Sequence, residues 1–309
     1  MSRASEIANN VWLGSSADMR LGVDGKNKWG VLIEASDLAQ MPPPETLSDL
    51  LEMADHSSEQ LFLEFPGSGT VSPSSLSAVD VDGVIDTCRW IHAIANGEQN
   101  DESESHDADG DHRMMTPMRR QPRKVLIHCT DGYTETSLLG LAYLMFVEAL
   151  TVHSAWIKMH TEKNRNFFAY DKDLAFLRYA EHKLLEAAAS VRNQCLELPK
   201  PPPPEWLYRM DGSLPSRVLP YMYLGNLLHA NNCGLLQAVG IKRVLSIGEE
   251  VTWSQEERKA FGENNVMTLR DLQDNGCDPL DHQFRRCLKF IGLCPVPSPS
   301  PSQGSSRHM

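Results

Sequence analysis

The stretch Val125-Leu126-Ile127-His128-Cys129-Thr130-Asp131-Gly132-Tyr133-Thr134-Glu135-Thr136 decides the fold of this 309-residue chain. It starts with apolar residues typical of a buried strand, and an apolar run typical of a buried helix begins at Leu138. A short loop between a strand and a helix N-terminus points backbone N–H groups at one spot, which suits a phosphate and lowers the pKa of a thiol. We therefore expect an anion-binding loop in which Cys129 is the nucleophile.

Composition sets limits on the class of protein. With 41% hydrophobic and 23% charged residues, the chain has the make-up of one or two soluble domains. The net charge of −12 argues against binding to nucleic acid and gives no attraction to anionic membranes. The longest apolar run, Leu138 to Val152, is interrupted by Glu148 and is short for a membrane span.

Cysteine usage bears on the cellular compartment. The seven cysteines show neither a disulfide framework nor a CxxC pair; they stand at positions 88, 129, 195, 233, 277, 287 and 294. The N-terminus is polar and lacks the apolar core of a signal peptide. We therefore expect a reducing compartment, the cytoplasm or the nucleus. Apart from Cys129, the cysteines are expected to be buried or incidental thiols.

Strand-like and helix-like segments alternate along the first two thirds of the chain. The expected strands are 10–14, 30–34, 60–65 and 124–128, and the expected helices are 79–95, 136–150, 154–161 and 173–189. The strands are apolar enough to be covered on both faces. This pattern predicts an α/β fold, a mainly parallel sheet flanked by helices, with the Cys129 loop at the carboxyl end of a strand.

Three segments lack the pattern of a packed core. Residues 198–205 are a proline-rich linker, and an acidic segment of about 96–121 is expected to be a disordered insertion. Residues 295–309, rich in proline and serine, are expected to form a disordered tail. The Asp107-x-Asp109 piece of the insertion resembles a calcium loop, but no glutamate closes it, so we expect no metal site.

An internal similarity divides the chain into two related parts. Val11-Trp12-Leu13-Gly14-Ser15 matches Met222-Tyr223-Leu224-Gly225-Asn226, and each stretch precedes a small, polar helix entry. On its own a five-residue match is equally compatible with two unrelated edge strands.

Longer stretches carry a resemblance to a known family. Pro215 to Gly225, Ile241 to Ile247 and Asp271 to Ile291 resemble the first half of a dual-specificity protein phosphatase, and His128-Cys129-x-x-Gly132-x-x-x-Thr136 resembles the phosphate loop of that family. The whole chain is similar to a fungal class with tandem phosphatase-like domains. The resemblance implies a cysteine-phosphatase-like domain at 1–197 and the N-terminal part of a second at 206–294, a truncated copy expected to be incomplete.

The resemblance also implies roles for individual residues. Cys129 would attack phosphorus, His128 would orient the loop and Thr136 would assist turnover of the thiolate. Asp274 stands where the second domain would carry its general acid. On local grounds, its interpretation as a turn residue before Pro279 is equally supported. Thiolate phosphoryl transfer needs no cofactor, and the expected partner is a phosphorylated protein. The phosphate would lie on the amides of Thr130, Asp131, Gly132, Tyr133, Thr134 and Glu135.

Two departures from the family pattern put turnover in doubt. The family arginine belongs at Glu135, and the loop from Pro66 to Pro73 holds no aspartate for a general acid. A carboxylate about 4 Å from a phosphate charge is repelled by roughly 4 kcal/mol at an effective dielectric constant near 20. Alternatively, Glu135 points outward and Lys163, Arg165 or a basic partner supplies the positive charge.

Two classes of function follow. The first is a dual-specificity phosphatase, for phosphotyrosine and phosphoserine or phosphothreonine, that is catalytically impaired in this chain. The second is a pseudophosphatase that binds a phosphopeptide or scaffolds a relative without turnover. The direction in which the Glu135 side chain points discriminates between an intact and a disabled phosphate site.

Overall fold

The computed structural model describes residues 3–20, 28–71, 78–97, 120–192, 202–270, 272 and 281–292. It divides into two compact units, Met1–Leu224 and Gly225–Met309. The predicted tail, nearly all of the predicted insertion and Asp274 lie outside the described residues.

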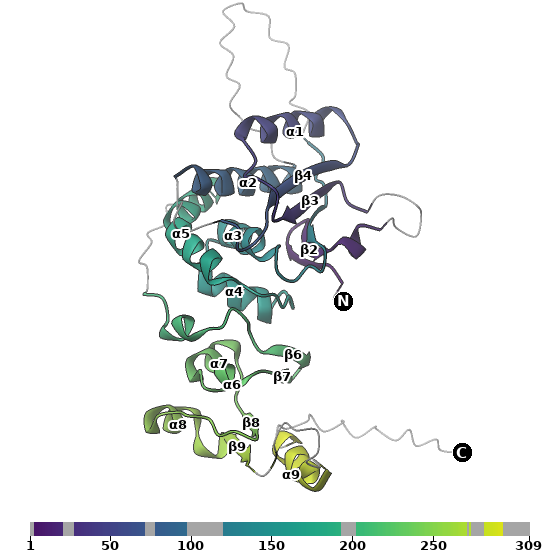
Figure 1. Ribbon diagram of the computed structural model, residues 1–309. Coiled ribbons are helices and arrows are strands. Elements are labelled where there is room, and N and C mark those ends of the chain that lie inside the picture. The colour runs from purple at the N-terminus through teal and green to yellow at the C-terminus, as the bar shows by residue number, and fades with distance from the viewer. Residues whose placement is uncertain are drawn as a thin grey trace, which may run out of the picture. The chain divides into compact units, whose positions relative to one another are not determined.

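The first unit is built on a five-stranded sheet (Figure 1). Its strand order is β1-β2-β5-β3-β4, and β1 alone runs antiparallel to its neighbour. The mainly parallel sheet predicted from the sequence is confirmed. The strands are β1 (Ser5–Ala8), β2 (Val11–Ser15), β3 (Val31–Ser36), β4 (Leu61–Pro66) and β5 (Val125–Cys129).

Strand β5 occupies the centre of this sheet. Val125 pairs in register with Val11 of β2 on one side and with Val31 of β3 on the other. All five residues of β5 are buried, which explains why the sequence places apolar residues there without alternation. Cys129 is the last residue of the strand, so the loop that follows begins at the carboxyl edge of the sheet.

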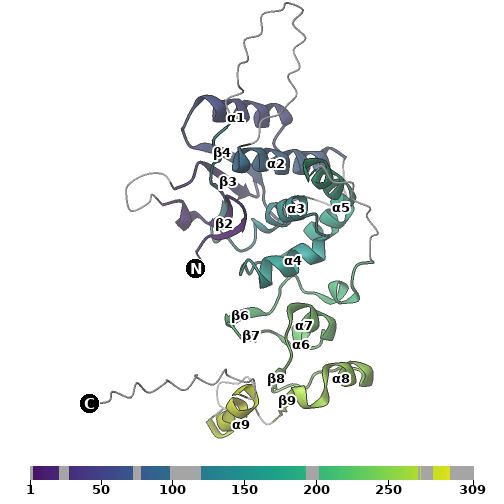
Figure 2. The ribbon, with the colours of Figure 1, turned by 180° about the vertical axis from the view of Figure 1, so that it is seen from behind.

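Helices α1 to α5 accompany the sheet (Figures 1 and 2). Of their described residues, those of α3 are the most deeply buried. It contacts α2, α4 and α5, and its residues from Ser137 to Phe146 are all buried. A helix that is apolar on every side fits this enclosed position. The helices are α1 (Pro44–His56), α2 (Ala78–Asn96), α3 (Ser137–Glu148), α4 (Val152–Thr161) and α5 (Asp171–Arg192).

Among the described residues, no single helix is long and apolar enough to cross a membrane. Helices α3 and α4 reach that length and composition only as a pair, and the pair is bent by 102°.

A second hairpin repeats the first one residue for residue. Strands β6 (Ser216–Leu219) and β7 (Met222–Leu224) are antiparallel, like β1 and β2. The pair Ser5–Leu13 corresponds to Ser216–Leu224, an offset of 211 residues for both partners (216 minus 5 and 224 minus 13), and both hairpins have a register shift at the same place. The similarity seen in the sequence therefore extends to strand pairing.

The second hairpin belongs to the first compact unit. The N–H of Ala169 donates to the carbonyl of Gly212 at 2.8 Å, and the amide of Asn166 donates to the hydroxyl of Ser216 at 2.9 Å. The division between the units thus falls after Leu224, whereas the sequence suggested a linker at 198–205.

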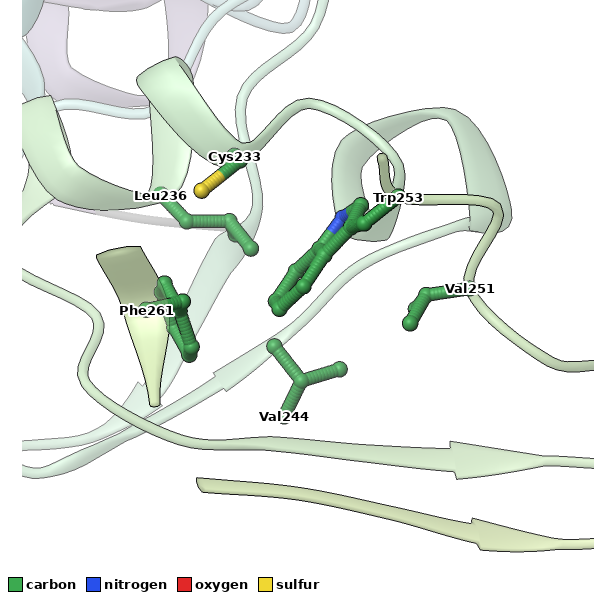
Figure 3. Close-up of a cluster of buried hydrophobic side chains, with 6 residues drawn as sticks. All are labelled: Cys233, Leu236, Val244, Val251, Trp253 and Phe261. Carbon is green, nitrogen blue, oxygen red and sulfur yellow. The ribbon is translucent and has the colours of Figure 1, made fainter. Parts of the chain in front are cut away.

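The second unit has its own small core (Figure 3). The indole of Trp253 packs edge-on against Phe261, with ring centroids 4.7 Å apart, and its N–H donates to the carbonyl of Ala230 at 2.8 Å. Strands β8 (Val244–Ile247) and β9 (Val266–Leu269) form a parallel pair. The helices are α6 (Leu227–Ala230), α7 (Cys233–Val239), α8 (Gln255–Phe261) and α9 (Asp281–Gly292).

Candidate functional site

The loop from Thr130 to Thr136 connects the central strand to the buried helix α3. Gly132 adopts a φ of 69°, and a Cβ at this position would collide with the carbonyl of Gly14 and with a guanidinium nitrogen of Arg165. Glycine is therefore required here both for its backbone conformation and for its lack of a side chain. The hydroxyl of Ser16 donates to the carbonyl of Thr130 at 3.2 Å and fixes the start of the loop.

The Cys129 thiol lies at the bottom of this loop and is only 2% exposed. The N–H of Gly132 donates to Sγ at 3.0 Å, as expected for a loop that supports a thiolate. Other groups oppose it: burial raises the pKa of Cys129 most, the hydrogen bond with Glu135 raises it next, and the charge of Glu135 and the hydrogen bond with Asp131 add to the rise. Together these groups outweigh the amide of Gly132, and the pKa of Cys129 is raised.

The Glu135 carboxylate points inward. A carboxylate oxygen of Glu135, one of Asp131 and the sulfur of Cys129 all lie within 4.8 Å of one another. Glu135 thus lies close to the thiol, in contrast to the outward direction that was the alternative from the sequence. This is the orientation that disfavours phosphate binding.

Asp131 uses one of the amides predicted to hold phosphate. The N–H of Tyr133 donates to Asp131 Oδ1 at 2.8 Å, and the Cys129 thiol donates to the same oxygen at 3.4 Å. A carboxylate of the loop itself therefore accepts a hydrogen bond that the sequence assigned to a phosphate oxygen. This hydrogen bond could not be predicted from the sequence, because an aspartate beside a turn is common for other reasons.

Arg165 lies behind the loop and is 1% exposed. Its guanidinium donates to the carbonyl of Gly132 and, at 3.3 Å, to the carbonyl of Arg3. Burial lowers the pKa of Arg165, and electrostatic interactions with Asp18, Cys129 and Asp131 raise it. Arg165, one of the two cations considered from the sequence, thus lies next to the loop, where its guanidinium donates to backbone carbonyls.

Lys163, the other basic candidate, is engaged elsewhere. Its ammonium group pairs with Glu148 at 3.4 Å, and Lys158 pairs with the same carboxylate. It therefore contributes to an ion-pair cluster formed with the end of α3.

The loop after β4, where the family general acid would belong, is fastened to the Cys129 loop. The N–H of Ser68 donates to the carbonyl of Glu135 at 3.1 Å, and the hydroxyls of Ser68 and Ser137 are 2.9 Å apart. The N–H of Gly69 donates to Asp173 Oδ1 at 2.9 Å. Burial raises the pKa of Asp173 to about 6, against weaker lowering by Gly69 and Ser68. Sequence reasoning assigned Asp173 to a helix start and missed its burial.

A cavity of about 530 Å³ opens beside the loop. Four carboxylates and one ammonium group line it, which gives a formally negative wall: Asp37, Glu135, Asp171, Asp211 and Lys172. Ser68 and Gly69 contribute to the lining, whereas Cys129 does not. An anion entering this cavity meets net repulsion.

The remaining predicted site residues lie as follows. His128 is 3% exposed, and burial lowers its pKa, so the imidazole is neutral near pH 7. Thr136 is fully buried at the start of α3, and its hydroxyl has no hydrogen-bond partner among the described residues. The roles assigned to both stay predictions.

The chain has a curated relative over most of its length. It is 25% identical, over 345 residues covering 86% of this chain, to "Dual specificity protein phosphatase PPS1" of Saccharomyces cerevisiae. The chain resembles the dual-specificity protein phosphatases. It spans 40% of the length of that relative, and no family model matches the chain.

Solved structures of dual-specificity phosphatases are also similar to the chain, at low scores. DUSP15 is 13% identical, with a TM-score of 0.38, and the match covers 64% of this chain and all of that one. Human DUSP28 is 14% identical (TM-score 0.36, 60% and 99% covered), and the Yvh1 phosphatase domain of Chaetomium thermophilum is 12% identical (TM-score 0.37, 60% and 97% covered).

Proposed function

We propose that this dual-specificity phosphatase-like chain keeps the nucleophile of a phosphoprotein phosphatase but has largely lost turnover. The inward Glu135 carboxylate carries the proposal, since it lies within 4.8 Å of the Cys129 sulfur where the family has an arginine. An arginine attracts the phosphate and a carboxylate repels it by roughly 4 kcal/mol at 4 Å.

Two further observations support impairment. Asp131 already accepts the hydrogen bond of the Tyr133 amide, so a phosphate oxygen would have to displace a carboxylate to use it. The described residues of the loop after β4, from Gly67 to Val71, contain no carboxylate to protonate a leaving group. Asp173, whose carboxylate accepts a hydrogen bond from the N–H of Gly69 in that loop, is fully buried and does not line the cavity.

The alternative of a phosphopeptide-binding module is weaker on the same grounds. A module that retains phosphopeptides needs a positive pocket, and the cavity beside Glu135 has four carboxylates against Lys172. A scaffolding role that does not depend on phosphate remains compatible with the acidic cavity. The free thiols among the described residues are Cys88, Cys129, Cys233 and Cys287. Free thiols support our proposal that the protein is in a reducing compartment, the cytoplasm or the nucleus.

A second candidate, retained hydrolysis, rests on Arg165. This guanidinium interacts electrostatically with Cys129 and supplies positive charge near the thiol. It donates to the carbonyls of Gly132 and Arg3, however, so at least part of its hydrogen-bonding capacity is used by the backbone of the protein. A charge used in this way stabilises the loop more than an external oxyanion.

Turnover of an aryl phosphate by the full chain tests the proposal. Aryl phosphates leave as stable phenolates, so the missing general acid matters little and the effect of Glu135 is isolated. We expect negligible turnover by the wild type and a rise of about 10²- to 10³-fold in Glu135→Arg. Glu52→Arg, on the exposed face of α1, is the matched control and should change nothing.

Two outcomes discriminate further. Wild-type turnover on the order of 1 s⁻¹ that disappears in Cys129→Ser would contradict impairment. Activity that rises in Glu135→Arg and is abolished by adding Cys129→Ser would assign the nucleophile directly. If Glu135→Arg stays inactive while folded, Glu135 is not the decisive defect and the proposal fails as stated.

A further inference from the structure

Three donors of metal-binding type converge at the front of the loop. The sulfur of Cys129 and one carboxylate oxygen each from Asp131 and Glu135 lie within 4.8 Å of one another. Cys129 is buried, Asp131 is exposed and Glu135 is partly exposed, so the group extends from the floor of the loop to solvent.

The spacing fits a tetrahedral ion with little rearrangement. Ligand bonds of about 2.3 Å to sulfur and 2.0 Å to oxygen place neighbouring donors about 3.5 Å apart. The sulfur of Cys129 and Oδ1 of Asp131 are already 3.4 Å apart. The Glu135 oxygen, within 4.8 Å of both, needs only a side-chain rotation.

The backbone that carries these donors is held in place independently of any ligand. Gly132 is wedged against Gly14 and Arg165, and the carbonyl of Glu135 accepts hydrogen bonds from both the N–H and the hydroxyl of Ser68. A fixed backbone lowers the entropy that is lost when ligands are gathered around an ion.

The adjoining cavity favours cations over anions. Glu135 belongs to its wall together with Asp37, Asp171 and Asp211, and this negative wall raises the local concentration of divalent cations. With Glu135 at the position of the family arginine, the loop should therefore prefer cations, whereas a phosphatase loop prefers anions. This step rests on the inward Glu135 of the proposed function.

We propose that Cys129, Asp131 and Glu135 bind a divalent transition-metal ion of the Zn²⁺ class. The mixed thiolate and carboxylate donors suit Zn²⁺ and Co²⁺ better than Mg²⁺ or Ca²⁺, which take oxygen ligands alone. On binding, the Cys129 S–H bond breaks, a sulfur–metal bond forms and the proton leaves to solvent. The three protein donors leave a fourth position for water.

Titration of the reduced, metal-free full chain with Co²⁺ tests this site. Sulfur coordination gives a thiolate-to-cobalt absorption band in the near ultraviolet, and tetrahedral geometry gives visible bands. We expect one Cys129-dependent equivalent that Zn²⁺ displaces. Cys129→Ser should lose the sulfur band, and Glu135→Gln should weaken binding by roughly tenfold or more. Cys287→Ser and Glu52→Gln, a thiol and a carboxylate away from the loop, should leave the band unchanged.

The outcomes separate this proposal from the previous one. A sulfur band that persists in Cys129→Ser, or no saturable band in a chain whose circular dichroism is native, overturns the metal site. Glu135→Arg should abolish Co²⁺ binding and gain binding of inorganic phosphate. A Glu135→Arg variant that still binds Co²⁺ and does not bind phosphate would also overturn the metal site. Metal-free wild type that hydrolyses aryl phosphate defeats the proposed impairment and leaves the cobalt result standing.

Discussion

The front and the back of the loop after β5 carry opposite charge. On the front, the carboxylates of Asp131 and Glu135 converge on the Cys129 sulfur. On the back, the buried guanidinium of Arg165 binds the carbonyl of Gly132. In a phosphate-binding loop the cation is needed at the front, where it meets the oxyanion. The difference teaches that one loop can be stabilised by a buried cation while carboxylates gather around its thiol.

The back of the loop should be the more sensitive side for stability. Arg165→Met removes a buried cation that binds two backbone carbonyls, and we expect a loss of about 3–5 kcal/mol in the free energy of unfolding. Lys163→Met is the control; its surface ion pair with Glu148 should be worth at most about 1 kcal/mol. Urea denaturation measures both. Equal midpoints for the two variants would remove the structural role given to Arg165.

The close contact of Gly132 with Gly14 and Arg165 predicts the next largest effect on stability. Gly132→Ala introduces a Cβ that meets Gly14 and Arg165 at a φ of 69°, and should cost about 3 kcal/mol. Gly240→Ala is closely matched, with a φ of 84° and nothing within 4 Å of the added Cβ, and should cost only about 1 kcal/mol. Thermal unfolding of both variants separates crowding from backbone strain. A similar cost at both positions would mean that the loop relaxes away from Gly14.

Asp173, which is buried beside the loop after β4, predicts a pH dependence of the stability. The pKa of Asp173 is about 6 in the folded chain against 3.8 for the unconstrained group. The folded state therefore binds more protons than the unfolded state between about pH 4 and pH 6, and stability falls as the pH rises through this window. Asp173→Asn keeps an acceptor for the Gly69 N–H and removes this loss.

The expected gain in Asp173→Asn is about 2–3 kcal/mol above pH 7 and close to zero below pH 4. Denaturant midpoints measured across this pH range show the difference between the variant and the wild type. Asp171→Asn, at an exposed neighbour, should show no such pH dependence. A gain that is the same at every pH would rule out protonation of Asp173 as its cause.

The front of the loop should respond most clearly in reactivity. Glu135 raises the pKa of Cys129 through a hydrogen bond and through its charge, so Glu135→Gln should lower that pKa. The Cys129-dependent rate of alkylation at pH 7 should then rise about severalfold. Asp171→Asn serves as the control, because Asp171 lines the cavity but does not shift the Cys129 pKa. An unchanged rate profile would mean that Glu135 does not face the thiol in solution.

Sequence reasoning recovered most of the sheet and the place of the loop. The apolar segments near 10–14, 30–34, 60–65 and 124–128 became β2, β3, β4 and β5. The fully buried β5 has apolar residues without alternation, whereas the edge strand β4 exposes every second residue at its start, Phe62 and Glu64. Helix α1 went unpredicted, since its stretch is polar and begins at the third of three consecutive prolines. Strand β1 was missed for a similar reason: Ser5–Ala8 carries only one buried side chain.

The charges at the site were harder to predict than the fold. The sequence identified Glu135 as a departure, but its direction depends on how the loop folds over Cys129. The burial of Asp173 depends on Gly69, 104 residues earlier in the chain, so no local pattern could show it. Whether Arg165 turns to solvent or to the backbone was equally a matter of tertiary contacts.

The hydrogen bond from Arg165 to the carbonyl of Arg3 has a practical consequence. The same guanidinium also donates to the carbonyl of Gly132, so it connects the first described residues of the chain to the loop through two hydrogen bonds. The N–H of Ala4 is also held, by Asp18 at 3.2 Å. We therefore expect a change to the backbone around Arg3 and Ala4 to perturb the loop that carries Cys129.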